Sequence, residues 1–217
     1  MTAEPWTLAQ SGQFCLALSA GRSVEDILEV YGADTSKARW LTSEEWFGIY
    51  EPTATSTALR AGSLGGWSFC IEFDNCIGFT PGIRRELSKE TETFILSRTG
   101  HALTTLQYLA DEELVESFEP GSDTSSVPSG HDFAGRVKRL TDSSDGVTAC
   151  LEVLAEYTGH YLTTALLHGP LLSVTVQDPD REGLTRAEPN RPGETTTAGT
   201  ATSLGRRLGT IGPGADA

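Results

Sequence analysis

The spacing of apolar residues predicts helices at the start of the chain. Residues 6–19 form a mostly apolar stretch, which we interpret as a first helix. Between Ser23, a typical N-cap residue, and Gly32, a typical helix end, apolar side chains recur at intervals of three and four. Thr42 and Glu45 have the spacing of a capping box for a third, short helix. The first fifty residues are therefore predicted to be largely helical.

The hydrophobic pattern changes to a period of two in the middle of the chain. Residues 53–63 are rich in small side chains, and we interpret them as a loop that can move. Aromatic and apolar residues then alternate with others over residues 67–73, which is typical of a half-buried strand. Residues 76–79 are predicted to return as a second strand, and Pro81 to begin a short helix. Three further strands are expected at residues 91–97, 103–110 and 114–118.

The helical spacing returns after a loop at residues 120–130. Helices are expected around residues 133–140, 145–157 and 162–166, and a last strand at residues 171–176. The order of helices, antiparallel meander and helices predicts an α+β fold. We expect an antiparallel sheet of about five to six strands with helices packed on one face.

The predicted core consists of apolar residues on the buried faces of these helices and strands. Its members are Phe14, Leu18, Ile27, Leu28, Trp67, Phe69, Ile71, Phe94, Leu96, Phe118, Leu151 and Leu154. Trp67 has the same parity as Phe69 and Ile71, so we expect it on the core face of its strand rather than in a ligand site.

The composition changes at Gln177. Residues 177–217 contain no aromatic residue and are rich in proline, glycine and threonine. Such a segment buries too little apolar surface to offset the entropy of ordering, so we predict a disordered tail. Residues 1–176 are expected to form a single α+β domain.

The charge of the chain restricts the classes of partner that it can bind. The sequence carries 30 acidic and 16 basic residues, a net charge of -14, and the predicted tail is almost balanced. A surface this acidic repels phosphate, which argues against nucleic acid and anionic membranes as partners. The sequence has neither a secretory signal nor an apolar run long enough to cross a bilayer. A cytoplasmic protein is expected.

The residue types that hold metals and cofactors show no recognisable spacing. The four cysteines form no C-x-x-C pair, and we expect four free thiols. Cys70 and Cys76 are predicted on opposite faces of a hairpin, where they cannot bond. The histidines, His101, His131, His160 and His168, include no pair four residues apart. No metal, cofactor or nucleotide is therefore expected.

Several segments together resemble a known family. They are Phe14-Cys15-Leu16, Ser23 to Leu28, Gly66 to Glu72, Leu87 to Glu92, and Phe118-Glu119-Pro120. Over about residues 6 to 176 the chain resembles an uncharacterised bacterial domain-of-unknown-function family of small acidic α+β proteins. The resemblance implies the architecture and transfers no activity or site. Glu90 departs from the family pattern, which has a small residue at this position.

Four aromatic residues within eleven positions are the first candidate site. Trp40, Trp46, Phe47 and Tyr50 are typical either of a helix that docks its aromatic side on the sheet or of a recognition patch. Glu72 and His101 are weaker candidates. Alternation predicts a solvated strand carboxylate at Glu72, and the other interpretation is a general base beneath a covered face.

Two classes of function remain open. The acidity without a catalytic motif favours a non-enzymatic interaction module for a basic protein, and an immunity or inhibitor-type protein is one form of it. The alternative is a small enzyme or small-molecule binder whose site forms near the central sheet from Glu72, His101 and the residues around Trp46. The sequence leaves the partner, the ligand and the oligomeric state undetermined.

Overall fold

The computed structural model describes residues 12–51, 53, 55–73, 75–101, 103–122 and 130–177. The strands are β1 (Phe14–Ala20), β2 (Arg39–Leu41), β3 (Ser56–Leu64), β4 (Trp67–Glu72), β5 (Glu92–Arg98), β6 (Thr104–Ala110), β7 (Glu113–Phe118) and β8 (Leu171–Gln177). The α-helices are α1 (Val24–Val30), α2 (Ser43–Ile49), α3 (Pro81–Ser88), α4 (Phe133–Thr141), α5 (Gly146–Thr158) and α6 (Thr164–His168). Two 3₁₀ helices are η2 (Thr35–Lys37) and η3 (Ile77–Phe79). The tail expected from residue 177 lies outside the described residues, except for Gln177, which ends β8.

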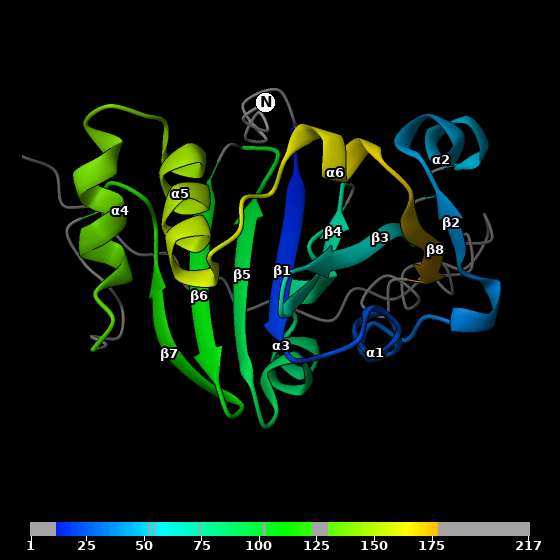
Figure 1. Ribbon diagram of the computed structural model, residues 1–217, viewed down its shortest axis with the longest axis horizontal. Coiled ribbons are helices and arrows are strands. Elements are labelled where there is room, and N and C mark those ends of the chain that lie inside the picture. The colour runs from blue at the N-terminus through cyan, green and yellow to red at the C-terminus, as the bar shows by residue number, and fades with distance from the viewer. Residues whose placement is uncertain are drawn as a thin grey trace, which may run out of the picture. The chain divides into compact units, whose positions relative to one another are not determined.

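The eight strands of the described residues form one antiparallel sheet in the order β2-β8-β3-β4-β1-β5-β6-β7 (Figure 1). The predicted α+β class is confirmed, with more strands than the five to six expected. The meander of β5, β6 and β7 lies where the sequence pattern placed it. The first strand, β1, lies inside the sheet between β4 and β5, so the sheet is completed by segments far apart in the sequence.

The prediction of a helix over residues 6–19 is wrong for its described part. Residues 14–20 form β1, whose side chains are buried on both faces of the sheet. A strand buried on both faces is a continuous apolar run without alternation, and periodicity cannot distinguish such a run from a buried helix.

The helices pack on both faces of the sheet, which corrects the prediction of one covered face. One face, here called the α5 face, carries Phe14, Leu16 and Leu18 of β1 against α4, α5 and α6. The other, the α1 face, carries Cys15 and Ala17 against α1, α3 and η3. Because both faces are covered, the central strands read as apolar runs instead of as alternating ones.

Two further segments differ from the prediction. Residues 56–64, expected within a mobile loop, form the nine-residue strand β3 between β8 and β4. Small side chains occupy this strand because the sheet is crowded there: a Cβ on Gly62 would lie 2.7 Å from Leu171 Cδ2. Residues 77–79, expected in a strand, form η3, which turns back over the α1 face and leads into α3.

The capping signals predicted the helix boundaries well. Ser23 with Asp26, and Thr42 with Glu45, form the expected capping boxes of α1 and α2. Gly159 ends α5 in the left-handed region. The predicted core is buried except for Trp67 and Leu151, which are half-buried. Trp67 packs against the α5-face core as expected, with its ring centroid 5.8 Å from that of Phe94.

Candidate functional site

The carboxyl of Glu72 is completely buried on the α1 face. Glu72 is the last residue of β4, and its parity directs the side chain away from Phe69 and Ile71. The interpretation of a solvated carboxylate is wrong, because η3 covers this face. The two carboxyl oxygens accept hydrogen bonds from the amides of Ile77 at 2.8 Å and Gly78 at 2.9 Å. These amides open η3, so the carboxyl fixes the start of that helix.

Burial raises the pKa of the Glu72 carboxyl to about 8, and the two amide hydrogen bonds oppose this shift only in part. A carboxyl with this pKa retains its proton near neutral pH, unlike an exposed glutamate. The side chain can therefore hold or release a proton within the physiological pH range. This is the property of a general acid or base, and here it lies beneath a covered sheet face.

The hydroxyl of Tyr31 shares this buried space. Tyr31 follows α1, and its Oη makes no hydrogen bond with any described group. Burial raises the pKa of the Tyr31 hydroxyl well above its usual range, and the nearby Glu72 carboxyl adds to the shift. Gly78 closes the space, since a Cβ there would lie 2.3 Å from Tyr31 Oη and 2.9 Å from Glu72 Oε1. Only glycine fits at this position.

Two thiols lie against the same carboxyl. The register of β1 on β4 places Cys15 directly opposite Glu72. Cys76 precedes η3, and its Sγ lies 3.7 Å from the carbonyl oxygen of Phe14, beside the peptide that leads into Cys15. Contact with the Cys76 thiol, together with burial, raises the pKa of the Cys15 thiol well above its usual range. The same contact lowers the pKa of the Cys76 thiol.

The sequence pattern missed this cluster. All four cysteines are free, as predicted, but the reason given for Cys70 and Cys76 is wrong because Cys76 is not in a strand. The partner of Cys76 is Cys15, which is distant in sequence. No local motif joins the two, and only recognition of β1 as the neighbour of β4 would have brought them together.

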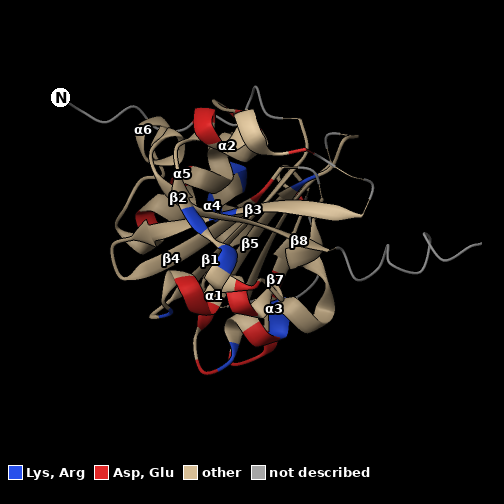
Figure 2. Ribbon diagram, turned by 90° about the vertical axis from the view of Figure 1, so that its right-hand side faces the viewer, with Lys and Arg blue, Asp and Glu red and all other residues tan. Residues whose placement is uncertain are grey.

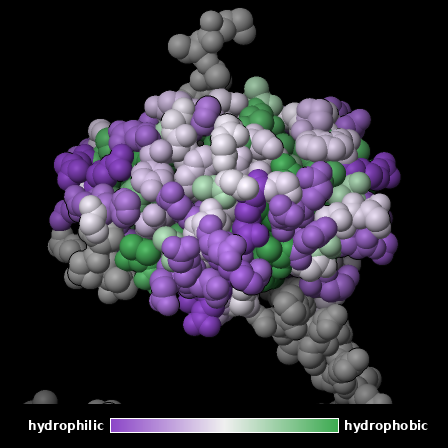
Figure 3. All heavy atoms as spheres, turned by 60° about the horizontal axis from the view of Figure 1, so that its bottom comes forward, coloured by the Kyte–Doolittle hydropathy of each residue, from purple (hydrophilic) through white to green (hydrophobic). Residues whose placement is uncertain are grey.

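Eight exposed carboxylates gather at one end of the sheet, and we call them the acidic rim. Its members are Glu25, Asp26, Glu29, Glu86, Glu90, Asp111, Glu112 and Glu113. The rim is continuous: the amide of Glu112 donates to Ser88 at 3.3 Å, and the guanidinium of Arg22 joins the start of α1 to the end of α3. Figure 2 shows acidic residues gathered around α1 and α3. The face brought forward in Figure 3 is predominantly hydrophilic.

Three residues of the rim adopt a conformation that favours glycine. Glu90, Asp111 and Glu112 have φ angles of 58°, 49° and 70°. Left-handed backbone costs a residue with a Cβ about 1 kcal/mol or more. The conformation explains why a small residue was expected at position 90. Carboxylates occupy these positions in spite of the conformational cost.

Two clefts of about 410 Å³ each open beside the rim and share Gly21 and Arg22. The first is polar, and its lining includes the carboxylates of Asp26, Glu86 and Glu90 together with the cations of Arg22 and Lys89. The second is lined by the β3–β4 turn, the start of α1, and the side chains of Trp40 and Trp67. Carboxylates and the exposed indole ring of Trp40 thus adjoin one another, an arrangement that suits a cationic chain.

The structure divides the four aromatic candidates into two pairs. Trp46 is buried, and Tyr50 stacks on it at a centroid distance of 5.3 Å. Trp40 and Phe47 are 57% and 51% exposed. The Phe47 ring contacts Phe73 at 5.6 Å, just after β4. The helix-docking interpretation therefore fits Trp46 and Tyr50, and only Trp40 lines a cleft described above.

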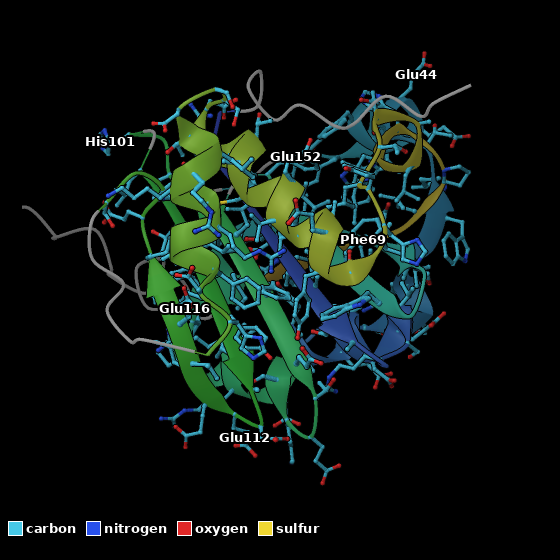
Figure 4. All side chains as sticks on the ribbon, turned by 60° about the vertical axis from the view of Figure 1, so that its left-hand side comes forward. Glu44, Phe69, His101, Glu112, Glu116 and Glu152 are labelled. Carbon is cyan, nitrogen blue, oxygen red and sulfur yellow. The ribbon has the colours of Figure 1, made fainter. Side chains whose placement is uncertain are left out.

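His101 is exposed in the connection between β5 and β6 (Figure 4). Among the described contacts, neither His101 nor Trp46 touches the Glu72 cluster. Within the described residues, no group of three or more histidine, cysteine or acidic side chains has the arrangement of a metal site. In the same part of the chain, no helix is long and apolar enough to cross a membrane.

Comparison with known proteins gives one match. Residues 3–132 match the model of a family described as "Family of unknown function (DUF6461)". No match was found among curated proteins or among solved structures.

Proposed function

We propose that this chain, which belongs to the family of unknown function DUF6461, is an acidic protein-interaction module that binds a basic partner through its acidic rim. The supporting observation is the concentration of eight exposed carboxylates on one end of the sheet. Among the described residues, the cations within this stretch of surface are Arg85, Lys89 and the half-buried Arg22, and Lys89 lies 3.7 Å from Glu86. The rim therefore has a strong excess of negative charge, which attracts and orients a basic surface.

The strained positions support the same function. A turn at positions 111 and 112 favours aspartate or asparagine first and glycine second, so Asp111 suits its position and Glu112 does not. At Glu112 a carboxylate stands where glycine would be more stable. Strain at an exposed position is a reason to infer a functional role for the side chain that causes it.

The second cleft supplies the contact that gives such an interface its specificity. Trp40 is exposed and lines this cleft next to the rim. A lysine or arginine over an indole ring gains about 0.5–2 kcal/mol. We infer that a basic segment lies along the acidic rim and places a cation or its aliphatic stem on Trp40. An immunity or inhibitor-type protein against a basic enzyme is one form of such a module. The free cysteines are consistent with a cytoplasmic location.

The test uses a fluorescently labelled decalysine peptide and two variants of equal net charge. The first replaces Glu86, Glu90 and Glu112 with glutamine. The control replaces Glu44, Glu51 and Glu119, which are exposed outside the rim; Figure 4 shows Glu44 and Glu112 at opposite ends. The rim variant should bind about tenfold more weakly at low salt, because each lost contact removes roughly 0.5 kcal/mol.

The control variant should bind within about twofold of the wild type, and added salt should weaken the wild-type complex. Trp40→Ala should weaken binding about three- to tenfold without changing the stability of the fold. Equal losses in the two triple variants would mean that only net charge matters and would refute the rim as the binding surface.

A second candidate function is a small enzyme or small-molecule binder with its site beside the central sheet. The observation that favours it is the buried Glu72 carboxyl between two thiols. Glu72→Gln would abolish such an activity and leave decalysine binding unchanged, whereas the rim variant would do the reverse.

A further inference from the structure

Cys15 and Cys76 differ from the other two cysteines in their surroundings. Cys70 shares the α1 face but is completely buried, and burial raises the pKa of its thiol well above the usual range. Cys150 lies on α5, against the opposite face of the sheet, where burial has the same effect. Cys76 is half-buried, whereas the other three cysteines are fully buried. Only Cys76 combines partial exposure with a neighbouring thiol.

Three contacts fix the pair in place. Cys15 is opposite Glu72 on the neighbouring strand. The Glu72 carboxyl binds the amides of Ile77 and Gly78, and this holds the residue before them, Cys76, over the start of β1. The Cys76 sulfur accordingly reaches the Phe14 carbonyl at 3.7 Å. The pair therefore joins β1 to the start of η3, and both sulfurs lie on the α1 face.

The two thiols have complementary chemistry. Contact with the Cys15 thiol favours the thiolate of Cys76 and disfavours that of Cys15. The thiolate is the form that attacks an oxidant, and it must be accessible to do so. Of the two thiols, Cys76 has the lowered pKa and the greater exposure, so it is the one better suited to attack. Cys15 is the buried neighbour that would react with the sulfenic acid formed on Cys76. This is the arrangement of an attacking and a resolving cysteine.

We propose that Cys15 and Cys76 form a peroxide-sensitive dithiol that closes to a disulfide between β1 and η3. In the first step the Cys76 thiolate attacks one oxygen of a hydroperoxide. An S–O bond forms and the O–O bond breaks; with hydrogen peroxide the departing hydroxide takes a proton and leaves as water. In the second step the Cys15 sulfur attacks the Cys76 sulfenic acid, an S–S bond forms, and the hydroxyl leaves as a second water. Two thiols and one peroxide thus give one disulfide and two waters.

Glu72 is the group that handles protons in this cluster. Glu72 is paired with Cys15 across the strands, its carboxyl binds the two amides that follow Cys76, and it is shielded from solvent. It can supply a proton to the departing hydroxide and receive the proton of the Cys15 thiol afterwards. The unpartnered Tyr31 hydroxyl, which is buried beside the same carboxyl, offers a further hydrogen bond to a leaving oxygen. These two groups position protons and take no part in the S–S bond.

The test treats the full chain with hydrogen peroxide, blocks the remaining thiols with a maleimide, and maps disulfides by mass spectrometry of proteolytic peptides. The expected product is a peptide pair linked through Cys15 and Cys76, with Cys70 and Cys150 still blocked by maleimide. Cys76 in the reduced chain should react with maleimide at least about tenfold faster than Cys70 or Cys150, since thiolate fraction and exposure both favour it.

Variants separate the two roles. In Cys15→Ala, Cys76 should stop at the sulfenic acid, which dimedone captures; in Cys76→Ser, the disulfide should be absent and Cys15 should stay reduced. Cys150→Ser is the matched control and should form the linked peptides at the wild-type rate. The wild-type mapping does not depend on the folding of any variant. A wild-type chain in which Cys76 oxidises while Cys15 stays free, or links instead to Cys70 or to another chain, would overturn the proposal.

Discussion

At the scale of single residues, Glu72 has the most unusual environment. Two backbone amides and a closed apolar face surround a carboxyl that an isolated strand would expose to water. The burial penalty outweighs the two hydrogen bonds, so the pKa rises to about 8 from an ordinary value of 4.5. Over most of the pH range between these two values, Glu72 therefore keeps its proton in the folded protein and loses it in the unfolded chain.

The stability of the protein should accordingly fall as the pH rises from about 4.5 to about 8 and level off above that value. Between these limits the folded state binds more protons than the unfolded state, so the free energy of unfolding decreases with pH. The loss attributable to Glu72 is up to about 5 kcal/mol. Urea unfolding at a series of pH values measures it.

In Glu72→Gln this part of the pH dependence should disappear. The substitution should also lower the free energy of unfolding by about 1 kcal/mol, because an amide is an imperfect match for two N–H donors. Glu116→Gln is the matched control. Glu116 is also buried and accepts from two amides, those of Phe133 and Ala134, on α4. Its replacement leaves Glu72 in place. Parallel pH curves for the wild type and Glu72→Gln would show that the carboxyl is not the source.

At the scale of elements, Arg60 holds one edge of the sheet together. It lies in β3 and is completely buried. Its guanidinium donates to the carbonyls of Leu41 at 2.9 Å, Leu167 at 2.8 Å and Gly169 at 3.1 Å, and to Ser43 Oγ at 2.7 Å. One side chain thus joins β2, the start of α2 and the end of α6. The short edge strand β2 depends on this contact as well as on its pairing with β8.

Arg60→Met should cost about 3–5 kcal/mol, because it leaves several buried carbonyls without a donor at roughly 1–3 kcal/mol each. Urea unfolding measures the loss, and hydrogen exchange of the Arg39–Leu41 amides should quicken most. Arg136→Met is the control: its ion pair with Glu156, at 2.6 Å, is half exposed and should contribute less than about 1 kcal/mol. Similar losses in both variants would contradict the special role of Arg60.

At the scale of the whole molecule, charge is unevenly distributed. The chain has a net charge of -14, and a large share of its described carboxylates lies on the acidic rim. Close carboxylates of like charge repel one another and destabilise the folded state, and salt screens this repulsion. A basic partner would relieve the same repulsion on binding.

Raising sodium chloride from 0.02 M to roughly 0.2 M should therefore raise the thermal midpoint by about 2–4 °C, since the shorter Debye length screens the repulsion between the rim charges. Differential scanning calorimetry measures the midpoint. The variant with glutamine at Glu86, Glu90 and Glu112 should lose most of this increase. The variant at Glu44, Glu51 and Glu119 should retain it. A midpoint independent of salt in the wild type would mean that the rim carboxylates do not repel appreciably.

The sequence by itself determined the features that depend on a few neighbouring residues. Capping boxes at Ser23 and Thr42 defined two helices, Gly159 ended a third, and the meander from β5 to β7 followed from alternation and turns. Composition determined the acidity, and the resemblance to a family of unknown function is confirmed for residues 3–132. These signals are local, because a cap or a turn is made by residues within one or two turns of chain.

The tertiary structure alone decided which faces were covered and which distant residues met. Residues 14–20 form a strand and not a helix because β4 and β5 accept them on both edges and helices cover both faces. The same packing buries Glu72 and brings Cys15 to Cys76. The residues next to Glu72 in the sequence would be the same whether its carboxyl faced water or lay under a 3₁₀ helix. The difference between the two cases is the solvation of the carboxyl, which only the assembled fold determines.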